Sequence, residues 1–518
     1  MSNEALLKDY AIVVSEYDNL AVVKTPVTAG SRLDFDGRII TVTGDVSPGH
    51  RFATRDIAEG EFVRQYGQPI GTSRGIREGE PITHGNMSNE VPIVRELPED
   101  LHTPAPDYLD EIEIPTFMGY CRPDGRVGTR NYVLIVPTSM CASHEASQIS
   151  TLAEFTLWNE QKYPNVSGVT AIPHNKGCGC NDGSTVEILM RTLANYADHP
   201  NVGGVILIDL GCEKTNLQLL DRYLGKYSLV QNKPIARIGI QDVGGTQAAI
   251  KHGLEIVEGM LPEVNKAERT PVPAGELVLG LKCGGSDGFS GLSANPALGA
   301  CSDLLIRCGG TALLTEVPEF CGAEHLLAQR SKDAETGRAV YAMVDWYKDY
   351  AAKFGAVLNQ NPSPGNKAGG LLNITIKSLG AIAKGGTSRV EGVIGYAERV
   401  RERGLNLMQG PGYDQESTPG LVASGANIVV FTTGRGTTIG NAITPVVKMS
   451  SNTATFERMS RDIDVNAGTV IDGTETIPQV GERLFRHVLK VASGEIPANA
   501  EVHKHREFQV WAEQAIAL

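Results

Sequence analysis

Apolar and polar positions alternate in short runs over the first part of the chain. The segments 20–27, 38–46 and 61–71 carry apolar side chains at strand spacing and are bounded by glycine, proline or aspartate, which end strands and form turns. Residues 89–115 are acidic, rich in proline and without apolar period, which is typical of an extended connection. The pattern therefore predicts a small β-rich module at 1–88 and a linker at 89–115.

After the linker, apolar runs alternate with segments of helical period. The runs 132–139, 167–174, 203–211 and 235–242 fit buried strands, and 184–198 and 215–227 carry apolar residues at helical spacing. Two capping-box patterns, Ser184 with Glu187 and Thr215 with Gln218, predict where the two helices begin. The alternation favours a parallel α/β domain over 116–270.

A second α/β domain is predicted over 271–518. We expect strands at 277–285, 311–317 and 427–436, a long helix over 322–354 and a polar loop at 361–370. The predicted fold class is therefore α/β, with a β-rich N-terminal module followed by two α/β domains with mainly parallel sheets. A division into domains is expected for 518 residues, because a single hydrophobic core stops growing near ~250–300 residues.

Charge and composition exclude several classes of protein. The formal charge of −13 at pH 7 argues against a nucleic-acid partner, because phosphate binding requires a basic face. No apolar run reaches the ~18 residues of a membrane span, and the N-terminus lacks a secretory pattern, so we expect a cytoplasmic protein without a membrane partner. Nine cysteines, an odd number, fit reduced thiols better than disulfides. The expected partner is a small molecule, and the sequence leaves room for a homo-oligomer.

Two cysteine-bearing turns follow predicted strands of the first α/β domain. His174 and Cys178 lie between a strand and a helix, and Cys212 with Glu213 follows the next strand. The carboxyl ends of parallel strands meet at one edge of a sheet, where ligands bind. Histidine, cysteine and glutamate are ligands of divalent metals, so the turns predict a metal site. Buried cysteines packed under glycine turns are the structural alternative.

Polar glycine-rich loops follow the first strands of the second α/β domain. One contains Lys282 and three side chains suited to a polyol: Ser286, Asp287 and Ser290. Glu316 and Glu319 follow the next predicted strand. These two acids are either functional carboxylates or solvated capping groups.

Two later loops place cations among glycines. The side chains with a predicted role there are Asn366, Lys367, Thr433 and Arg435. Arginine binds a carboxylate through two parallel hydrogen bonds, and lysine acts as a point charge or a base. In an acidic chain these fixed cations favour a carboxylated ligand.

Together these segments resemble the altronate and galactarate dehydratase family over nearly the whole chain. The matching segments are GRVGTRNY at 125–132, residues 174–178, DLGCEK at 209–214, KCGGSDGFSG at 282–291, SANPALG at 293–299, LTEVPE at 314–319, NPSPGNKAGG at 361–370, FTTGRGT at 431–437 and DVNAGT at 464–469. The resemblance implies an SAF-type N-terminal module. It also implies dehydration of an aldonic or aldaric acid to a 2-keto-3-deoxy acid with a divalent metal, Fe²⁺ or Mn²⁺.

Such a dehydration removes the proton α to a carboxylate and expels the 3-hydroxyl group, so it needs a base, an acid and stabilisation of an enediolate. Proton transfer is assigned to Glu316 or Lys282, and carboxylate binding to Arg435 and Lys367, with Lys367 as a further candidate base. Metal ligation is assigned to His174, Cys178 and Cys212. Further substrate contacts are assigned to Ser286, Asp287, Ser290, Asn366 and Thr433.

The N-terminal module departs from the family pattern. Ser15 stands where family modules usually carry a histidine, and a His-x-His-Asn segment is present only as Thr83-His84-Gly85-Asn86, although His50 is retained. The module is expected to lie over the crevice as a cover and to tune substrate choice. The substrate is therefore less constrained than the reaction type.

Three alternatives stay open at the level of the sequence. One is an iron–sulfur dehydratase in which Cys178, Cys212 and Cys283 hold a [4Fe–4S] cluster with one iron open. Another is a lyase that eliminates sulfite from sulfolactate. The third is a sugar-acid-binding homologue without catalytic activity.

Overall fold

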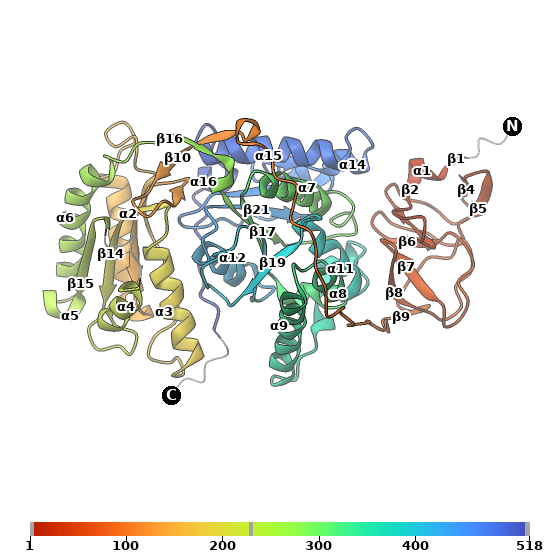
Figure 1. The fold of residues 1–518 in the computed structure, drawn as a ribbon, viewed down its shortest axis with the longest axis horizontal. Coiled ribbons are helices and arrows are strands. Elements are labelled where there is room, and N and C mark those ends of the chain that lie inside the picture. Colours follow the sequence, from red (N-terminus) through yellow and green to blue (C-terminus); the bar gives the residue numbers. More distant parts are fainter. Residues whose placement is uncertain (1–4, 227–231, 513–518) are drawn as a thin grey trace.

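The computed structural model describes residues 5–226 and 232–512. The N-terminal module and the middle α/β domain lie at opposite ends of the molecule, with the C-terminal α/β domain between them (Figure 1). The two α/β domains contain four- and seven-stranded sheets in which every strand pair is parallel. The predicted fold class is therefore confirmed.

The N-terminal module contains three small sheets, with the strand orders β1-β4-β5, β2-β3-β6 and β7-β8-β9. Its elements are β1 (Ala5–Leu6), α1 (Leu7–Tyr10), β2 (Ala11–Ile12), β3 (Leu20–Val23), β4 (Arg32–Phe35), β5 (Arg38–Thr41), β6 (Arg51–Ala53), β7 (Phe62–Gln65), β8 (Gln68–Ser73) and β9 (Met87–Ser88). The prediction of a single strand at 61–71 is wrong. Tyr66 and Gly67 have φ of 59° and 70°, and this left-handed turn folds the segment into the hairpin β7–β8.

The segment 89–115 runs along the C-terminal domain (Figure 1). The Thr103 amide donates to Lys332 O at 3.4 Å, and the Leu109 amide donates to Arg307 O at 2.8 Å. The segment ends in a short 3₁₀ helix, η1 (Glu111–Glu113). It is extended as predicted, but backbone hydrogen bonds fasten it to the domain that it crosses.

The middle domain has a four-stranded sheet in the order β13-β12-β14-β15. Its elements are β12 (Tyr132–Pro137), η2 (Met140–Ala142), α2 (Ser143–Thr156), β13 (Gly168–Ala171), α3 (Ser184–Ala197), β14 (Val202–Asp209), α4 (Leu217–Leu224), β15 (Ile235–Gly239), α5 (Ile240–Val243) and α6 (Thr246–Val264). A small antiparallel sheet, β11 (Val127–Gly128), β10 (Thr116–Cys121) and β16 (Thr270–Pro273), joins the two ends of the domain.

The two predicted capping boxes do not form. Helix α3 begins at Ser184 itself, after Gly183 with a φ of 94°. Helix α4 begins at Leu217, because the Asn216 side chain accepts the Leu219 amide at 3.0 Å, and asparagine caps as well as threonine. The predicted end of this second helix, at 227, lies outside the described residues.

The C-terminal domain is built on a seven-stranded sheet in the order β19-β20-β18-β17-β21-β22-β23. Its first half contains η4 (Ala274–Glu276), β17 (Val278–Cys283), α7 (Ala294–Arg307), β18 (Thr311–Leu314), η5 (Val317–Phe320), α8 (Glu324–Gln329), α9 (Ala334–Ala352), η6 (Leu358–Gln360), α10 (Pro364–Ala368), α11 (Ile374–Ile382) and η7 (Ala383–Gly385). Its second half contains β19 (Val390–Ile394), β20 (Gly404–Met408), α12 (Asp414–Ala423), β21 (Ile428–Thr433), β22 (Val446–Ser450), α13 (Thr453–Arg458), β23 (Val465–Asn466), α14 (Gly468–Ile471), α15 (Ile477–Ser493) and α16 (Asn499–Val502).

The helix predicted over 322–354 is two helices, α8 and α9. The break occurs because the Asp333 side chain accepts the Thr336 amide at 2.8 Å and so starts a new helix. In the described part of the chain, no helix combines the length and the apolar character needed to cross a membrane.

The N-terminal module docks on the C-terminal domain through close backbone contacts. A Cβ atom added at Gly370 would lie 2.2 Å from Gly49 O, so side chains are excluded from this contact. Arg51 is 1 % exposed; its guanidinium donates to Gly370 O and, at 2.5 Å, to Gln65 Oε1. His50 Nε2 lies 3.3 Å from Ala368 O. The loop 48–51 therefore lies against the end of the loop 361–370.

Replacing Arg51 by methionine is expected to lower the free energy of unfolding by about 1–3 kcal/mol, because a buried carbonyl and a buried amide lose their donor. The measurement is the urea midpoint of the full chain. Arg55→Met is the control, since Arg55 is half exposed and pairs with Glu61 at the surface; such pairs contribute about 0–1 kcal/mol. Equal midpoints for the two variants would contradict this account of the docking.

Candidate functional site

The carboxyl edge of the seven-stranded sheet has a topological switch point. The strands β18, β20 and β19 lie on one side of β17, whereas β21, β22 and β23 lie on the other. Ligands of open parallel sheets bind in the crevice that such a switch creates. Cys283 ends β17, Thr433 ends β21 and Glu316 follows β18. The sequence-predicted loops of this domain therefore meet at one place.

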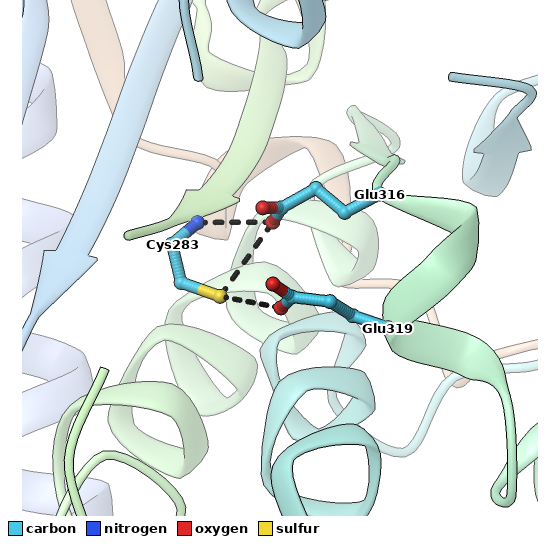
Figure 2. A group of neighbouring side chains, drawn as sticks. All are labelled: Cys283, Glu316 and Glu319. Carbon is cyan, nitrogen blue, oxygen red and sulfur yellow. Dashed lines mark hydrogen bonds between the residues drawn. The ribbon is translucent and has the colours of Figure 1, made fainter. Parts of the chain in front are cut away.

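Three side chains converge at this edge, as Figure 2 shows. Cys283 Sγ lies 3.1 Å from Glu319 Oε2 and 3.6 Å from Glu316 Oε2, and the Cys283 amide donates to Glu316 Oε2 at 3.1 Å. The three residues are buried, and their sulfur and carboxylate oxygens lie within 4.8 Å of one another. Glu316 has a φ of 76°, a strained value for a non-glycine residue, and such strain is concentrated at functional sites.

Lysine side chains surround this group. Lys282 Nζ pairs with Glu316 Oε1 and lies 2.8 Å from Asp414 Oδ1. Lys282 and Glu316 are both inaccessible to solvent, whereas the Asp414 side chain is 29 % exposed. The ion pairs therefore extend from the core to the surface at Asp414.

Two further lysines come from the segment that follows the loop 361–370. Lys384 Nζ lies 2.7 Å from Cys283 Sγ and 3.1 Å from Glu316 Oε2. Lys377 Nζ lies 2.7 Å from Glu319 Oε1. We call the full set the lysine–carboxylate network: Cys283, Glu316, Glu319, Asp414, Lys282, Lys377 and Lys384.

Burial and charge separate the pKa values of the two glutamates. Burial, together with the neighbouring Glu319 carboxylate, raises the pKa of Glu316. Burial also opposes the charge of Glu319, but the lysines, Lys377 foremost, outweigh it and lower the pKa of Glu319 to about 2. Two carboxyl groups whose environments push their pKa values apart are suited to different roles.

Lys282, Lys384 and Cys283 also have shifted pKa values. Burial alone would lower the pKa of Lys282, but Asp414 and Glu316 raise it above its usual value, so Lys282 stays charged. Burial would also lower the pKa of Lys384, which Cys283 and Glu316 raise. Burial and the nearby carboxylates raise the pKa of the Cys283 thiol, which stays protonated. The network offers cations and one carboxyl group with a raised pKa.

The Cys283, Glu316 and Glu319 group has the composition of a metal site, but its surroundings do not suit a divalent cation. Both carboxylates and the sulfur already face lysine ammonium groups. The three lysines balance the carboxylates of Glu316, Glu319 and Asp414, so a bound cation would add two uncompensated charges to a buried site. As arranged, the network is charge-balanced by its own side chains.

A cavity of about 530 Å³ lies between the N-terminal module and the C-terminal domain. Lys24 and Pro48 line it from the module, and Asp287, Arg435 and Arg458 line it from the domain. Lys24, Arg435 and Arg458 are cationic, whereas Asp287 and Asp472 are the acidic groups of the lining. The cations therefore outnumber the acids, and a guanidinium group can bind a carboxylate. Of the predicted substrate residues, Arg435 and Asp287 therefore border one cavity.

The other predicted substrate residues do not line this cavity, and most of them hydrogen-bond within the glycine-rich loops. Ser290 Oγ donates to Asp287 Oδ1 at 3.0 Å, and Asn366 Nδ2 donates to Ser286 O at 2.8 Å. Thr433 Oγ1 accepts the amide of residue 436 at 3.0 Å. These groups hold the glycine-rich loops together. Lys367 is exposed on α10.

The structure places the predicted metal ligands in the middle domain and does not bring them into one coordination sphere. His174 is buried; its Nε2 bonds Pro137 O at 2.9 Å and its Nδ1 accepts the Lys176 amide at 3.2 Å. Burial lowers the pKa of His174 to about 4. Over residues 5–226 and 232–512, the single compact group of three metal-ligand side chains is the one at Cys283.

Sequence reasoning missed Lys377, Lys384 and Asp414. Lys377 and Lys384 are seven residues apart in an apolar segment; Lys377 lies in α11 and Lys384 in the 3₁₀ turn η7 that follows it. Two lysines in a buried apolar segment are a signal for buried acidic partners. Asp414 carried no comparable signal.

Three domain models of one family match the chain in order. They are described as the altronate/galactarate dehydratase SAF domain, at 9–90, the D-galactarate dehydratase/altronate hydrolase second domain, at 119–265, and the D-galactarate/altronate dehydratase C-terminal domain, at 274–516. The altronate dehydratase of Bacillus subtilis (strain 168) is 35% identical over 508 residues, 96% of this chain and 98% of that protein. This chain belongs to the D-galactarate/altronate dehydratase family.

Two further relatives, a dehydratase and a sulfo-lyase subunit, are also similar to this chain over most of its length. The galactarate dehydratase (L-threo-forming) of Escherichia coli (strain K12) is 38% identical over 493 residues, 94% of this chain and 93% of that protein. The (2R)-sulfolactate sulfo-lyase subunit beta of Chromohalobacter salexigens is 32% identical over 401 residues, 77% of this chain and 97% of that protein. The predicted family, SAF module and hydro-lyase class are confirmed.

Proposed function

We propose that this dehydratase-family protein removes water from a sugar acid of the altronate or galactarate type and forms a 2-keto-3-deoxy acid. The observation that carries the proposal is the buried lysine–carboxylate network at the switch point of the C-terminal sheet. A cavity whose lining includes Lys24, Arg435 and Arg458 lies between the N-terminal module and the same domain. An α-proton abstraction requires a site for the substrate carboxylate and a carboxyl group with a raised pKa, and the cavity and Glu316 are the candidates for these two elements.

The main barrier of this reaction is the low acidity of the proton α to the carboxylate. Its removal places negative charge on the carboxylate oxygens as an enediolate, which needs preorganised cations. Lys282 and Lys384 are charged, buried and held by carboxylates. They are suited to stabilise this charge, and their raised pKa values make them poor bases.

Glu316 is the group suited to move the proton. Its raised pKa makes its carboxylate a stronger base than that of Glu319, whose low pKa keeps it ionised. Glu316 would take the α proton as a carboxylate. Once protonated, it would have a proton to return to the departing 3-hydroxyl group, which leaves as water.

The cavity supports the binding of a carboxylated substrate. Arg435 and Arg458 supply planar guanidinium groups, and Lys24 adds a third cation from the N-terminal module. A diacid or a monoacid sugar would have its carboxylates there, with its hydroxyl groups toward the polar loops. The module thus contributes to substrate choice through Lys24.

Fe²⁺ or Mn²⁺ dependence, which the family resemblance implies, stays a prediction. The residues at Cys283 do not suit such an ion, and each role proposed above is filled by this chain's own side chains. The assignment of metal ligation to His174, Cys178 and Cys212 also stays a prediction, although the hydrogen bonds of both His174 ring nitrogens oppose it for that residue.

The test is a substrate screen of the purified full chain. Aldonates and aldarates are incubated with and without Fe²⁺ or Mn²⁺ under anaerobic conditions, and 2-keto-3-deoxy products are measured by mass spectrometry. Turnover of at least one sugar acid is expected. Sulfolactate is included because one relative is a sulfo-lyase subunit; release of sulfite with no sugar-acid turnover would overturn the proposal.

Replacing Arg435 by lysine is expected to lower kcat/KM by about 10–100-fold, mainly through KM. A point charge cannot form the two-pronged contact that arginine makes with a carboxylate, and a hydrogen bond to a charged group contributes about 1.5–3 kcal/mol. The control is Arg486→Lys, on the exposed face of α15. Unchanged kinetics of Arg435→Lys on the true substrate would remove Arg435 from the binding site.

A further inference from the structure

The middle domain has a second switch point, and cysteines gather there. Its chain adds β13 on one side of β12 and β14 on the other. Cys141 follows β12, Cys178 follows β13 and Cys212 follows β14. All three are exposed, although free cysteine is among the most buried residue types. Three exposed thiols after adjacent strands of one sheet require an explanation other than packing.

Hydrogen bonds fasten the three cysteine loops to one another. The Met140 amide, next to Cys141, donates to Lys176 O at 2.7 Å. The Lys214 amide donates to Cys178 Sγ at 3.3 Å, which ties the second loop to the third. Ser139 Oγ donates to Glu213 Oε1 at 2.9 Å, which ties the first loop to the third. The loops therefore form one preorganised rim.

The residues next to the cysteines shape this rim, and the cysteines themselves are exposed. Buried His174 bonds Pro137 O and the Lys176 amide, so it fixes the second loop. A side chain at Gly177 would approach Ser139 Cβ to 3.1 Å, and one at Gly211 would approach Gln241 Oε1 to 2.9 Å. The residues before Cys178 and Cys212 are therefore glycines at positions where a side chain would crowd a neighbouring loop.

The surroundings of the rim favour an anionic thiolate centre. Gln241 Nε2 lies 3.5 Å from Cys212 Sγ, and the Lys214 amide donates to Cys178 Sγ; such hydrogen bonds to sulfur tune iron–sulfur clusters. Helices α2 and α3, each of 14 residues, begin at this edge, and helix N-termini stabilise negative charge.

As arranged, the three sulfurs are too far apart to share a single tetrahedral ion. A tetrahedral ion with bonds of about 2.3 Å to sulfur brings its thiolates to within about 4 Å of each other. Over the residues that the structure describes, these three cysteines do not form a group with all ligand atoms within 4.8 Å. In a cluster each thiolate binds a different iron, so the sulfurs lie farther apart.

We propose that Cys141, Cys178 and Cys212 hold a [4Fe–4S] cluster at the carboxyl edge of the middle-domain sheet. Three protein thiolates leave the fourth iron open to a small ligand. The site differs from the trio considered from the sequence, because Cys283 lies in the other α/β domain, buried against Glu319 and Lys384. The proposal is independent of the dehydration chemistry proposed above, so each can fail without the other.

The test uses the full chain purified without oxygen and reconstituted with Fe²⁺, sulfide and a thiol reductant. The readouts are iron and acid-labile sulfide per chain, visible absorbance, and electron paramagnetic resonance after reduction. The wild type is expected to bind about four iron and four sulfide per chain. The iron content per chain should fall at least tenfold in each of three variants, Cys141→Ser, Cys178→Ser and Cys212→Ser.

Two further variants make the test specific. Cys121→Ser removes an exposed thiol in β10 and should keep the full cluster, as should Cys283→Ala. Circular dichroism and the urea midpoint identify variants that fail to fold. Wild-type iron and spectra in Cys141→Ser, loss of the cluster in Cys283→Ala, or a single zinc ion without sulfide would each overturn the proposal.

Discussion

Replacing Glu316 by glutamine is expected to lower kcat by about 10²–10⁴-fold, the usual contribution of a positioned general base or acid. The amide keeps the size of the side chain but cannot accept the α proton. Because burial and Glu319 raise the pKa of Glu316, the acid limb of the wild-type kcat profile should lie above the usual glutamate value of about 4.3. The wild type loses activity as the pH falls through this limb, because Glu316 becomes protonated. The residual activity of the Glu316→Gln variant should show no such acid limb. The measurement is the initial rate of keto-acid formation from pH 4 to 9.

Glu324→Gln is the matched control. Glu324 is also inaccessible to solvent and pairs with Arg95 and Lys348, but it lies outside the lysine–carboxylate network. This variant should be destabilised and keep its kcat. If Glu316→Gln retains kcat within threefold, the proton-transfer group lies elsewhere.

Replacing Lys384 by methionine is expected to have the second largest effect, because it acts on both catalysis and stability. Loss of a preorganised cation should lower kcat by about 10²–10³-fold. Loss of one partner of a buried ion pair leaves the Glu316 carboxylate short of a counter-charge, which costs about 3–5 kcal/mol of unfolding free energy. The measurements are kcat and the urea midpoint.

A double variant keeps this prediction testable if Lys384→Met folds poorly. Adding Glu316→Gln removes the uncompensated charge, so the double variant should be more stable than Lys384→Met alone. Lys448→Met is the control, because Lys448 is buried and bonds backbone oxygens away from the network. A stable Lys384→Met with wild-type kcat would contradict the role of the network.

Local pattern predicted the strands and many of the loops that carry the site. The runs that became β12, β14, β17 and β21 are apolar and bounded by polar turns, so burial on both faces of a parallel sheet was encoded locally. The loops at Cys283, Glu316 and Arg435 could be placed at strand ends for the same reason. The capping residues of the helices could not be predicted in the same way, because Gly183 and Asn216 take the N-cap positions instead of Ser184 and Thr215.

Partnerships between side chains were beyond the sequence. The spacing of His174, Cys178 and Cys212 fitted a metal site, but the His174 nitrogens bond backbone groups of the domain's own loops. Lys384 reaches Glu316 across 68 residues of sequence. Such contacts depend on how helices pack over a sheet, which residue spacing does not specify.

The sequence by itself determined the fold class, the order of the three regions and the family, because these follow from apolar periodicity and from motifs contained within single loops. Tertiary structure decided which polar groups meet. It paired each buried carboxylate of the network with lysines from distant elements, because a charge removed from water needs a counter-charge within hydrogen-bonding distance. It also grouped Cys141 with Cys178 and Cys212, since parallel strands bring their carboxyl ends to one edge whatever their separation along the chain.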